Sequence, residues 1–266
     1  MDASGIAVVT GASRGIGRAL AVALAVAGFD VVATMRDPAA GANLADEVAA
    51  SGGRPGSMTV AALDVVRPEA IHLPDGMRVL VNNAGIERDY LPVEATPMDQ
   101  WREVFETNVY GLVEVTRRAV PIMRAGGGVI CNVTSSSLLF SVPFYGVYRA
   151  SKAAVQAMTE SLRVEVAPFG IRVIEVLPGP VDSDMLANSA RLPEAAGCPG
   201  YEPMAQAMYE GRLAIGDMVT PVSAAASAIA AAILDDGSAL RWPCDPLGGQ
   251  LLAGWQADPE STLGTR

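Results

Sequence analysis

The feature that most constrains the fold is a glycine-rich turn between a short apolar segment and an alanine-rich one. Residues 6–9 are apolar, residues 10–17 read Thr-Gly-Ala-Ser-Arg-Gly-Ile-Gly, and residues 18–27 have the composition of a helix. Glycines let a backbone approach a pyrophosphate, whose charge is favoured at the amino terminus of the following helix. The order predicts the start of a dinucleotide-binding fold. The spacing departs from Gly-x-Gly-x-x-Gly, however, and alone would fit an ordinary tight turn.

Short β-branched segments alternate with longer helical ones along the chain. This pattern predicts an α/β fold with a doubly wound parallel sheet of the Rossmann type, about seven strands with helices on both faces. A chain of 266 residues can bury roughly three-quarters of its unfolded surface in one core, so residues 1–266 are expected to form a single domain. The expected strands are residues 5–10, 30–34, 58–63, 78–82, 128–134, 171–176 and 238–242, and the expected helices lie near residues 15–28, 39–51, 98–124, 145–168 and 221–235.

The connection between the third and fourth expected strands is short. Only about twelve residues, 66–77, are available, and they include Pro68 and Pro74. In the strand order 3-2-1-4 the chain must cross ~14 Å and return along ~17 Å, whereas twelve helical residues span only ~18 Å. Proline also discourages a continuous helix. We therefore predict a loop with at most one helical turn, which leaves this face of the sheet thinly covered beside the helix at 98–124.

A Tyr-x-x-x-Lys unit, Tyr148 to Lys152, lies in the helix expected at 145–168, and Ser135 stands thirteen residues before the tyrosine. Tyrosine has an ordinary pKa of ~10 and is a poor acid or base near neutral pH. A lysine one helical turn away lies on the same helix face, and its charge favours the phenolate. A serine at a neighbouring strand end can hold the oxygen that gains or loses the proton. The spacing predicts a proton-transfer site, although the pair alone is a weak signal.

Other motifs surround this unit in a fixed order. Asn82-Asn83-Ala84-Gly85 follows the fourth strand, Asn108 lies on the next helix, and Pro178-Gly179 follows the sixth strand. Together with the glycine turn and the Ser-Tyr-Lys set, this order resembles the short-chain dehydrogenase/reductase family in its compact single-domain branch. The resemblance runs from about residue 5 to about residue 238 and is nearest to the hydroxysteroid dehydrogenase, retinol dehydrogenase and carbonyl reductase members.

The resemblance implies a reaction, the interconversion of a ketone or aldehyde and an alcohol by hydride transfer. In this reaction Tyr148 is the general acid or base, and Lys152 lowers the tyrosine pKa and binds the nicotinamide ribose. Ser135 holds the substrate oxygen, and Asn108 anchors a water molecule in the proton relay. Tyr145 lacks a lysine four residues further on and is expected to be a wall of the pocket.

The resemblance also implies a binding site for a nicotinamide dinucleotide. The glycine turn holds the pyrophosphate, Asp64 meets the adenine ring, and residues 178–183 hold the carboxamide end, with Ser183 where the family often has threonine. The expected cofactor contacts are Gly11, Ser13, Arg14, Gly15, Ile16, Gly17, Arg36, Asp64, Val65, Asn83, Ala84, Gly85, Tyr148, Lys152, Pro178, Gly179, Val181 and Ser183.

The end of the second strand bears on the choice between NAD and NADP. An acidic residue about twenty positions after the glycines binds the ribose 2′-hydroxyl of NAD, whereas arginine accommodates the 2′-phosphate of NADP. Thr34 stands at the usual acidic position, and Arg36 and Arg14 can converge on one phosphate. Two charge-assisted contacts of ~1.5 to 3 kcal/mol each would favour NADP about a hundredfold or more. NADP is expected; the alternative is an Asp37–Arg36 pair that leaves room for NAD.

Composition argues against several kinds of partner. A net charge of −10 and a pI near 4.6 disfavour nucleic acid and anionic membranes. The longest apolar segments, 19–29 and 222–234, are shorter than the ~20 residues of a membrane span, and no secretion signal begins the sequence. Three cysteines without metal or redox spacing suit the reducing cytoplasm. The single histidine, His72, has no ligand neighbours, so no metal site is expected.

Residues 182–217 are too long for a simple connector and are expected to form a lid over the substrate. Their apolar side chains suit an apolar alcohol or ketone, because methionine adapts to irregular ligands; packing of the lid itself explains them equally well. The residues concerned are Met185, Leu186, Leu192, Met204, Met208, Leu213 and Ile215, with Leu138, Leu139, Phe140 and Phe144 after the serine.

The resemblance leaves the substrate and the assembly open. A ketoacyl-thioester reductase or a sugar dehydrogenase would use the same residues on another small molecule. A nucleotide-binding sensor could keep the fold without catalysis, but such proteins commonly lose the tyrosine and lysine. Family members commonly dimerise through the helices that correspond to 98–124 and 145–168, so a homodimer or homotetramer is expected.

Overall fold

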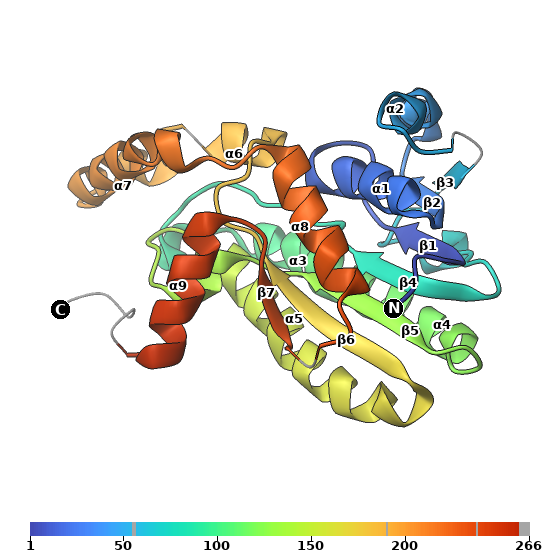
Figure 1. Ribbon diagram of the computed structural model, residues 1–266. Coiled ribbons are helices and arrows are strands. Elements are labelled where there is room, and N and C mark those ends of the chain that lie inside the picture. Colours follow the sequence, from blue (N-terminus) through green and yellow to red (C-terminus); the bar gives the residue numbers. More distant parts are fainter. Residues whose placement is uncertain (55–56, 190, 238, 261–266) are drawn as a thin grey trace.

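The computed structural model describes residues 1–54, 57–189, 191–237 and 239–260, and a parallel sheet lies at its centre (Figure 1). The strand order is β3-β2-β1-β4-β5-β6-β7, and every neighbouring pair is parallel. The predicted doubly wound sheet is confirmed. The strands are β1 (Ile6–Val9), β2 (Asp30–Met35), β3 (Met58–Ala62), β4 (Met77–Asn82), β5 (Gly128–Val133), β6 (Ile171–Leu177) and β7 (Arg241–Pro243). The predicted last strand began at residue 238, which lies outside the described residues; β7 begins at Arg241.

Helices cover both faces of the sheet (Figure 1). One face carries α1 (Gly15–Ala27), α2 (Leu44–Ala50) and α8 (Val222–Leu234), and the other carries α3 (Met98–Phe105), α4 (Leu112–Met123) and α5 (Gly146–Val166). Three further helices, α6 (Asp184–Ser189), α7 (Glu202–Ala214) and α9 (Pro246–Ala257), lie toward the opposite side from α2 in this view. No helix in the described part of the chain is long and apolar enough to cross a membrane.

Alternate strand residues point to opposite faces and build two cores. Val9 and Cys131 belong to the core beneath α1 and α8, whereas Val8 and Ile130 belong to the core beneath α4 and α5. All four side chains are fully buried. A sheet covered on both faces explains why its strands read as nearly continuous apolar runs.

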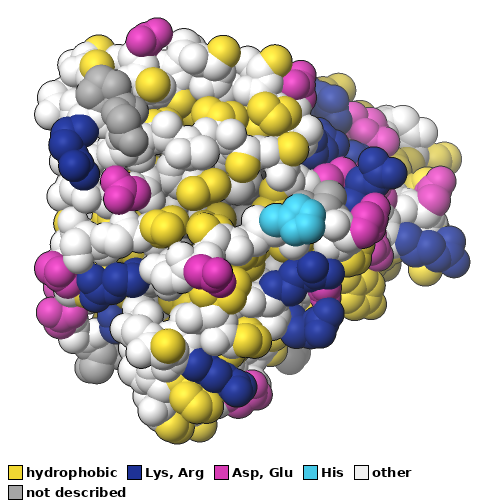
Figure 2. All heavy atoms as spheres, turned by 90° about the vertical axis from the view of Figure 1, so that its right-hand side faces the viewer, with side chains coloured by type: hydrophobic (Ala, Val, Ile, Leu, Met, Phe, Trp, Pro, Cys, Tyr) yellow, Lys and Arg dark blue, Asp and Glu magenta, His cyan; other side chains and the backbone are white. Residues whose placement is uncertain are grey.

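The short connection between β3 and β4 is a loop with one 3-10 turn, Pro68–Ala70, as predicted. Ile71 is 2% exposed and packs into the core beside α4, and Val66 and Leu73 pack against the same core. The loop thus contributes a few apolar side chains to this core, whereas a helix would contribute one entire apolar side of its surface. Figure 2 looks onto this side of the molecule, where the histidine lies between hydrophobic side chains on one side and charged ones on the other.

Two predicted helices are divided in the structure. The expected helix at 98–124 is interrupted by a π-helical segment, Glu106–Gly111, and the one at 39–51 divides into a 3-10 turn, Pro38–Gly41, and α2. Helix α9 was not predicted, because its three glycines lower the helix propensity of the segment. Its first residues did carry a signal, since Asp245 caps the helix and Pro246 occupies its first turn.

Candidate active site

A cavity of about 890 Å³ opens where the glycine turn, the carboxyl ends of the strands, α5 and the 182–217 segment meet. Ligands of open α/β sheets bind in this position. All but one of the site residues predicted from the sequence line this cavity; they are Gly11, Ser13, Arg14, Gly15, Ile16, Gly17, Arg36, Asp64, Val65, Asn83, Ala84, Gly85, Ser135, Tyr148, Lys152, Pro178, Gly179, Val181 and Ser183. Asn108 does not line it and lies behind the wall, 1% exposed.

The glycine turn is packed so closely that side chains have no room. A Cβ atom on Gly17 would lie 2.3 Å from the Asn83 amide nitrogen, and one on Gly11, whose φ is +67°, would lie 2.8 Å from Ala84. Asn83 donates hydrogen bonds from Nδ2 to the carbonyl groups of Thr10, at 2.9 Å, and Gly11, at 3.1 Å. The end of β4 thereby fixes the turn that follows β1.

This part of the cavity fits a dinucleotide. Helix α1 begins at Gly15 without a side-chain cap, so its first backbone N–H groups are left for an anion. Arg14 and Arg36 are exposed and line the same cavity. Arg14 forms a long, exposed ion pair of 3.4 Å with Asp184. The Asp37 carboxylate accepts a hydrogen bond from the Ala39 amide at 3.0 Å and so caps the following 3-10 turn, rather than pairing with Arg36.

The residue that faces the cavity at the end of β2 is Met35, not Thr34. Thr34 is 2% exposed, and its hydroxyl donates to the Val9 carbonyl at 3.0 Å. The assignment of Thr34 to the position that selects the coenzyme was therefore wrong by one residue. Because strand side chains alternate, a shift of one residue exchanges the two faces of the sheet. The end of β2 still presents no acidic side chain to the cavity, since Met35 carries no charge.

Ser135, Tyr148 and Lys152 converge at the centre of the cavity. Ser135 follows β5, and its hydroxyl accepts from the amide of Ser137 at 3.2 Å and from the hydroxyl of Ser137 at 2.9 Å. Lys152 is 5% exposed, donates to the Val133 carbonyl at 2.8 Å and lies 5.7 Å from the centre of the Tyr148 ring. The strand end and the first turns of α5 therefore hold the three polar groups together, as the spacing predicted.

Asn108 lies within the π-helical segment between α3 and α4. Its Oδ1 accepts from the Ile86 amide at 2.8 Å, and its Nδ2 donates to the Ile86 carbonyl at 2.9 Å and to the Ser151 hydroxyl at 3.0 Å. Single π turns in α-helices are frequent at functional sites. The contacts tie the loop after β4 to the start of α5, while a water relay through Asn108 stays a prediction.

The sequence profile of the short chain dehydrogenases matches residues 5–193. The chain belongs to the short-chain dehydrogenase/reductase family. Members are oxidoreductases that act on CH–OH groups, so the chain is an enzyme of this class.

Individual members of the short-chain dehydrogenase/reductase family resemble this chain over most of its length. The uncharacterized oxidoreductase YusZ of Bacillus subtilis is 39% identical over 194 residues, which are 69% of this chain and 68% of the relative. Retinol dehydrogenase 8 of Bos taurus is 36% identical over 212 residues, which are 76% and 67% of the two chains. A short chain dehydrogenase from Burkholderia cenocepacia, solved in complex with NADP, is 28% identical with a TM-score of 0.75 and covers 98% of this chain and 97% of its own.

The electrostatics of Tyr148 in this short-chain dehydrogenase/reductase differ from the sequence prediction. Burial, followed by the negative charge of Glu87, raises the pKa of Tyr148, and its hydrogen bond with Ser135 only partly opposes the rise. Burial also lowers the pKa of Lys152 to about 8. The prediction of a lowered tyrosine pKa considered the lysine alone. It omitted the loss of solvent around the phenol and a carboxylate that comes from another part of the chain.

The loop at 178–183 is braced by a residue that the sequence reading missed. Asp245, at the start of α9, is 8% exposed, and its carboxylate accepts from the Gly179 amide at 2.6 Å and from the Gly248 amide at 2.7 Å. A Cβ atom on Gly179 would lie 2.4 Å from this carboxylate. The carboxyl-terminal helix therefore helps to set the loop that is expected to hold the carboxamide.

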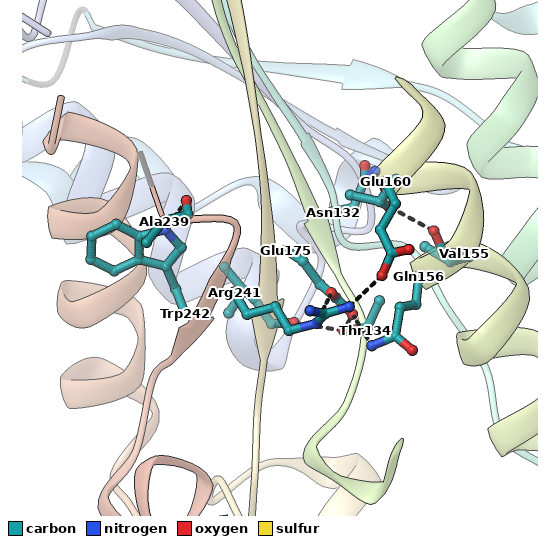
Figure 3. A network of polar contacts seen from close by, with 11 residues as sticks. Asn132, Thr134, Val155, Gln156, Glu160, Glu175, Ala239, Arg241 and Trp242 are labelled. Carbon is teal, nitrogen blue, oxygen red and sulfur yellow. Dashed lines mark hydrogen bonds and ion pairs between the residues drawn. The ribbon is translucent and has the colours of Figure 1, made fainter. Parts of the chain in front are cut away.

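A network of hydrogen bonds and ion pairs surrounds Glu175 (Figure 3). Glu175 on β6 is fully buried and accepts from the hydroxyl of Thr134, next to Ser135, at 2.8 Å and from Gln156, one turn after Lys152, at 3.3 Å. Arg241 on β7 places its Nε 3.2 Å from the second carboxylate oxygen and also pairs with Glu160. The network joins β5, α5, β6 and β7 behind the active site of the enzyme.

The 182–217 segment forms one wall of the cavity, apart from residue 190, which lies outside the described residues. Seven large apolar residues of the segment were singled out above. Met185, Leu186, Met208 and Ile215 line the cavity, whereas Leu192, Met204 and Leu213 are 45 to 56% exposed and do not. After the serine, Phe140 lines the cavity, and Leu139 and Phe144 are buried in small clusters. Packing thus accounts for a part of these residues, and an apolar substrate stays a prediction for those that line the cavity.

Arg212 of α7 connects the 182–217 segment to the catalytic helix. Its Nη2 donates to the Tyr145 hydroxyl at 2.8 Å, its Nη1 donates to the Ser189 carbonyl, and its guanidinium lies 4.3 Å from the centre of the Tyr90 ring. The rings of Tyr90 and Tyr145 stack at 4.9 Å. Tyr145 is thus a wall of the pocket, as predicted, and its hydroxyl is engaged.

Proposed function

We propose that this enzyme interconverts a ketone or aldehyde and an alcohol with NADP(H) as coenzyme. The observation that carries the proposal is the convergence of Ser135, Tyr148 and Lys152 in one cavity with the glycine turn and two exposed arginines. The coenzyme, when bound, supplies or accepts the hydride. The single domain with a lid at 182–217, drawn from the sequence, is part of the proposal.

Each side chain has a role in the proposed reaction. Tyr148 donates its phenolic proton to the carbonyl oxygen during reduction and takes a proton during oxidation. Ser135 donates a hydrogen bond to the same oxygen. Lys152 has a pKa of about 8, so its ammonium is largely retained near neutral pH and can bind the ribose hydroxyls. Asn108 holds the wall on which these groups depend through Ile86 and Ser151.

The preference for NADP rests on Arg14 and Arg36. Both line the cavity, the Arg14–Asp184 pair is exposed and contributes little, and Asp37 is engaged in capping. NADP in the Burkholderia cenocepacia relative supports the same choice. We expect the Arg14→Ala/Arg36→Ala double variant to lose about a hundredfold in kcat/KM for NADPH with little change for NADH. Steady-state kinetics with both coenzymes test this, and a native preference for NADH would contradict it.

Coenzyme oxidation across a panel of aldehydes, ketones, steroids, retinoids and acyl thioesters tests the proposed reaction. Turnover of apolar carbonyl compounds with NADPH is the expected result. Turnover confined to acyl thioesters or to sugars would transfer the assignment to a ketoacyl-thioester reductase or a sugar dehydrogenase. Tight coenzyme binding without turnover of any compound would indicate a sensor.

We also propose a homodimer or homotetramer in the cytoplasm. Tyr110, between α3 and α4, is 59% exposed, and Val113 and Val164 on α4 and α5 are 37% and 75% exposed. Exposed apolar side chains on these helices suit a contact with a second copy. Light scattering on the purified protein should give two or four times the mass of the chain, and a clean monomer would reject the oligomer.

The proposed location in the cytoplasm rests on the cysteines. Cys131, Cys198 and Cys244 are free, which suits a reducing compartment.

A further inference from the structure

Glu87 is a carboxylate in the wall of the cavity with no part in the reaction described above. It lies in the loop after β4, is partly buried and lines the cavity together with Tyr148. Its Oε1 is enclosed and has no partner at ordinary hydrogen-bond geometry among the residues that the structure describes; the Tyr90 hydroxyl is near enough to act on Glu87, but it too lies outside that geometry. A buried carboxylate with unused acceptor positions is costly. A ligand that brings a donor into the cavity would meet this need.

Glu87 lines the same cavity as Tyr148 and Tyr145. The ring of Tyr145 lies 4.9 Å from that of Tyr90, which acts on Glu87, and 5.8 Å from that of Tyr148. The negative charge of Glu87 also raises the pKa of Tyr148, in addition to the larger effect of burial. A group bound by Glu87 would therefore lie near the carbon whose oxygen meets Tyr148.

The surrounding charges select the kind of donor. Burial raises the pKa of Glu87, and the Tyr90 hydroxyl, followed by the positive charges of Arg212 and Arg191, lowers it. Arg212 is fixed by Tyr145 and Ser189, and Arg191 lies 3.0 Å from Glu194. Two nearby guanidinium groups disfavour a cationic amine, while Glu87 itself repels an anion. A neutral hydroxyl group suits both conditions.

On the basis of the proposed carbonyl–alcohol reaction, we propose that Glu87 accepts a hydrogen bond from a second hydroxyl group of the substrate. The substrates would then be hydroxyketones, or the corresponding diols, whose remaining part is apolar. The rest of the cavity agrees with this class, because Phe140, Met185, Leu186, Met208 and Ile215 line it. Glu87 is thereby a specificity-determining residue.

Matched pairs of ketones test this proposal. The pairs are α-hydroxyacetophenone with acetophenone and β-hydroxypropiophenone with propiophenone, reduced by the full-length enzyme with its preferred coenzyme. For each pair the ratio of kcat/KM, hydroxylated over plain, is compared between the unaltered enzyme and Glu87→Leu. The ratio is the useful quantity because Glu87 also acts on Tyr148, so that both absolute rates will change. We expect Glu87→Leu to lower the ratio at least about tenfold for one or both pairs.

Two further variants keep the test decisive. Glu87→Gln retains an acceptor oxygen and is expected to give an intermediate ratio, which also serves if Glu87→Leu does not fold. Asp75→Asn removes an exposed carboxylate that does not line the cavity, and should leave the ratio unchanged. Ratios within twofold of the unaltered enzyme in both Glu87 variants would overturn the Glu87 proposal while turnover persists. Failure of the unaltered enzyme to reduce any ketone would overturn the proposed reaction and Glu87's role with it.

Discussion

Tyr148→Phe is expected to lower kcat/KM for carbonyl reduction at least about a hundredfold, within the range that general acid catalysis contributes. The phenol is the proton donor of the proposed reaction, and a phenylalanine keeps the ring that packs at 5.8 Å against Tyr145. Coenzyme affinity should stay close to that of the unaltered enzyme, because Lys152 and the glycine turn are untouched. Steady-state kinetics and a fluorescence titration with NADPH measure the two quantities.

Tyr145→Phe is the matched control for this prediction. It removes a hydroxyl from the same helix and the same cavity, but that hydroxyl accepts a hydrogen bond from Arg212. The loss should stay below about tenfold, the scale of one ordinary hydrogen bond. Residual turnover above a tenth in Tyr148→Phe would reject the role of Tyr148. A larger loss in Tyr145→Phe than in Tyr148→Phe would transfer the role to Tyr145.

Arg241→Ala is expected to destabilise the protein by about 3 kcal/mol at neutral pH, the lower end of the cost of stranding a buried charge. Glu175 is fully buried, and Arg241 is the cation 3.2 Å from its carboxylate (Figure 3). The free energy of unfolding, measured in urea, gives the loss. Arg117→Ala is the control: it breaks an exposed ion pair with Glu114, and a much smaller loss is expected.

The loss in Arg241→Ala should depend on pH. Burial raises the pKa of Glu175 and Arg241 opposes this, so that removal of the arginine raises the pKa further. Near pH 4, close to the ordinary glutamate pKa of about 4.3, the Glu175 carboxyl group is largely protonated in the folded and in the unfolded protein. Arg241→Ala then causes only a small loss of stability. As the pH rises to 7, Glu175 ionises readily in the unfolded variant but not in the folded one. The destabilisation caused by Arg241→Ala therefore grows. An equal loss at both pH values, or no rescue by Glu175→Gln in the same chain, would contradict this account.

The sequence alone predicted those features of the fold and the site that depend on residues close together in the chain. Short β-branched, apolar segments placed the strands within a few positions, and the length of the 66–77 connection excluded a full helix. The Tyr-x-x-x-Lys spacing brought Tyr148 and Lys152 to the same cavity, because three or four residues correspond to one helical turn. Ser135 joined them because β5 ends beside α5.

The remaining features depend on segments that are distant in the sequence. Glu87, Tyr145 and Arg212 meet only after folding, so neither the raised pKa of Tyr148 nor the acceptor in the cavity has a local pattern. The Thr34 assignment required the register of β2 to within one residue, which hydrophobicity alone does not give. A π turn within a helix leaves the general hydrophobic pattern nearly unchanged, so the interruption at Glu106–Gly111 could not be read from it.

The contact between Asp245 and Gly179 links the recognised part of the chain to the part beyond it. The family profile ends at residue 193, yet the loop at 178–183 is held from α9, more than fifty residues later. A shortened or redesigned carboxyl terminus would thus act on the loop that is expected to hold the carboxamide without touching a signature residue. The part of the chain beyond the family profile is therefore a place where the shape of this loop can be changed while Ser135, Tyr148 and Lys152 are kept.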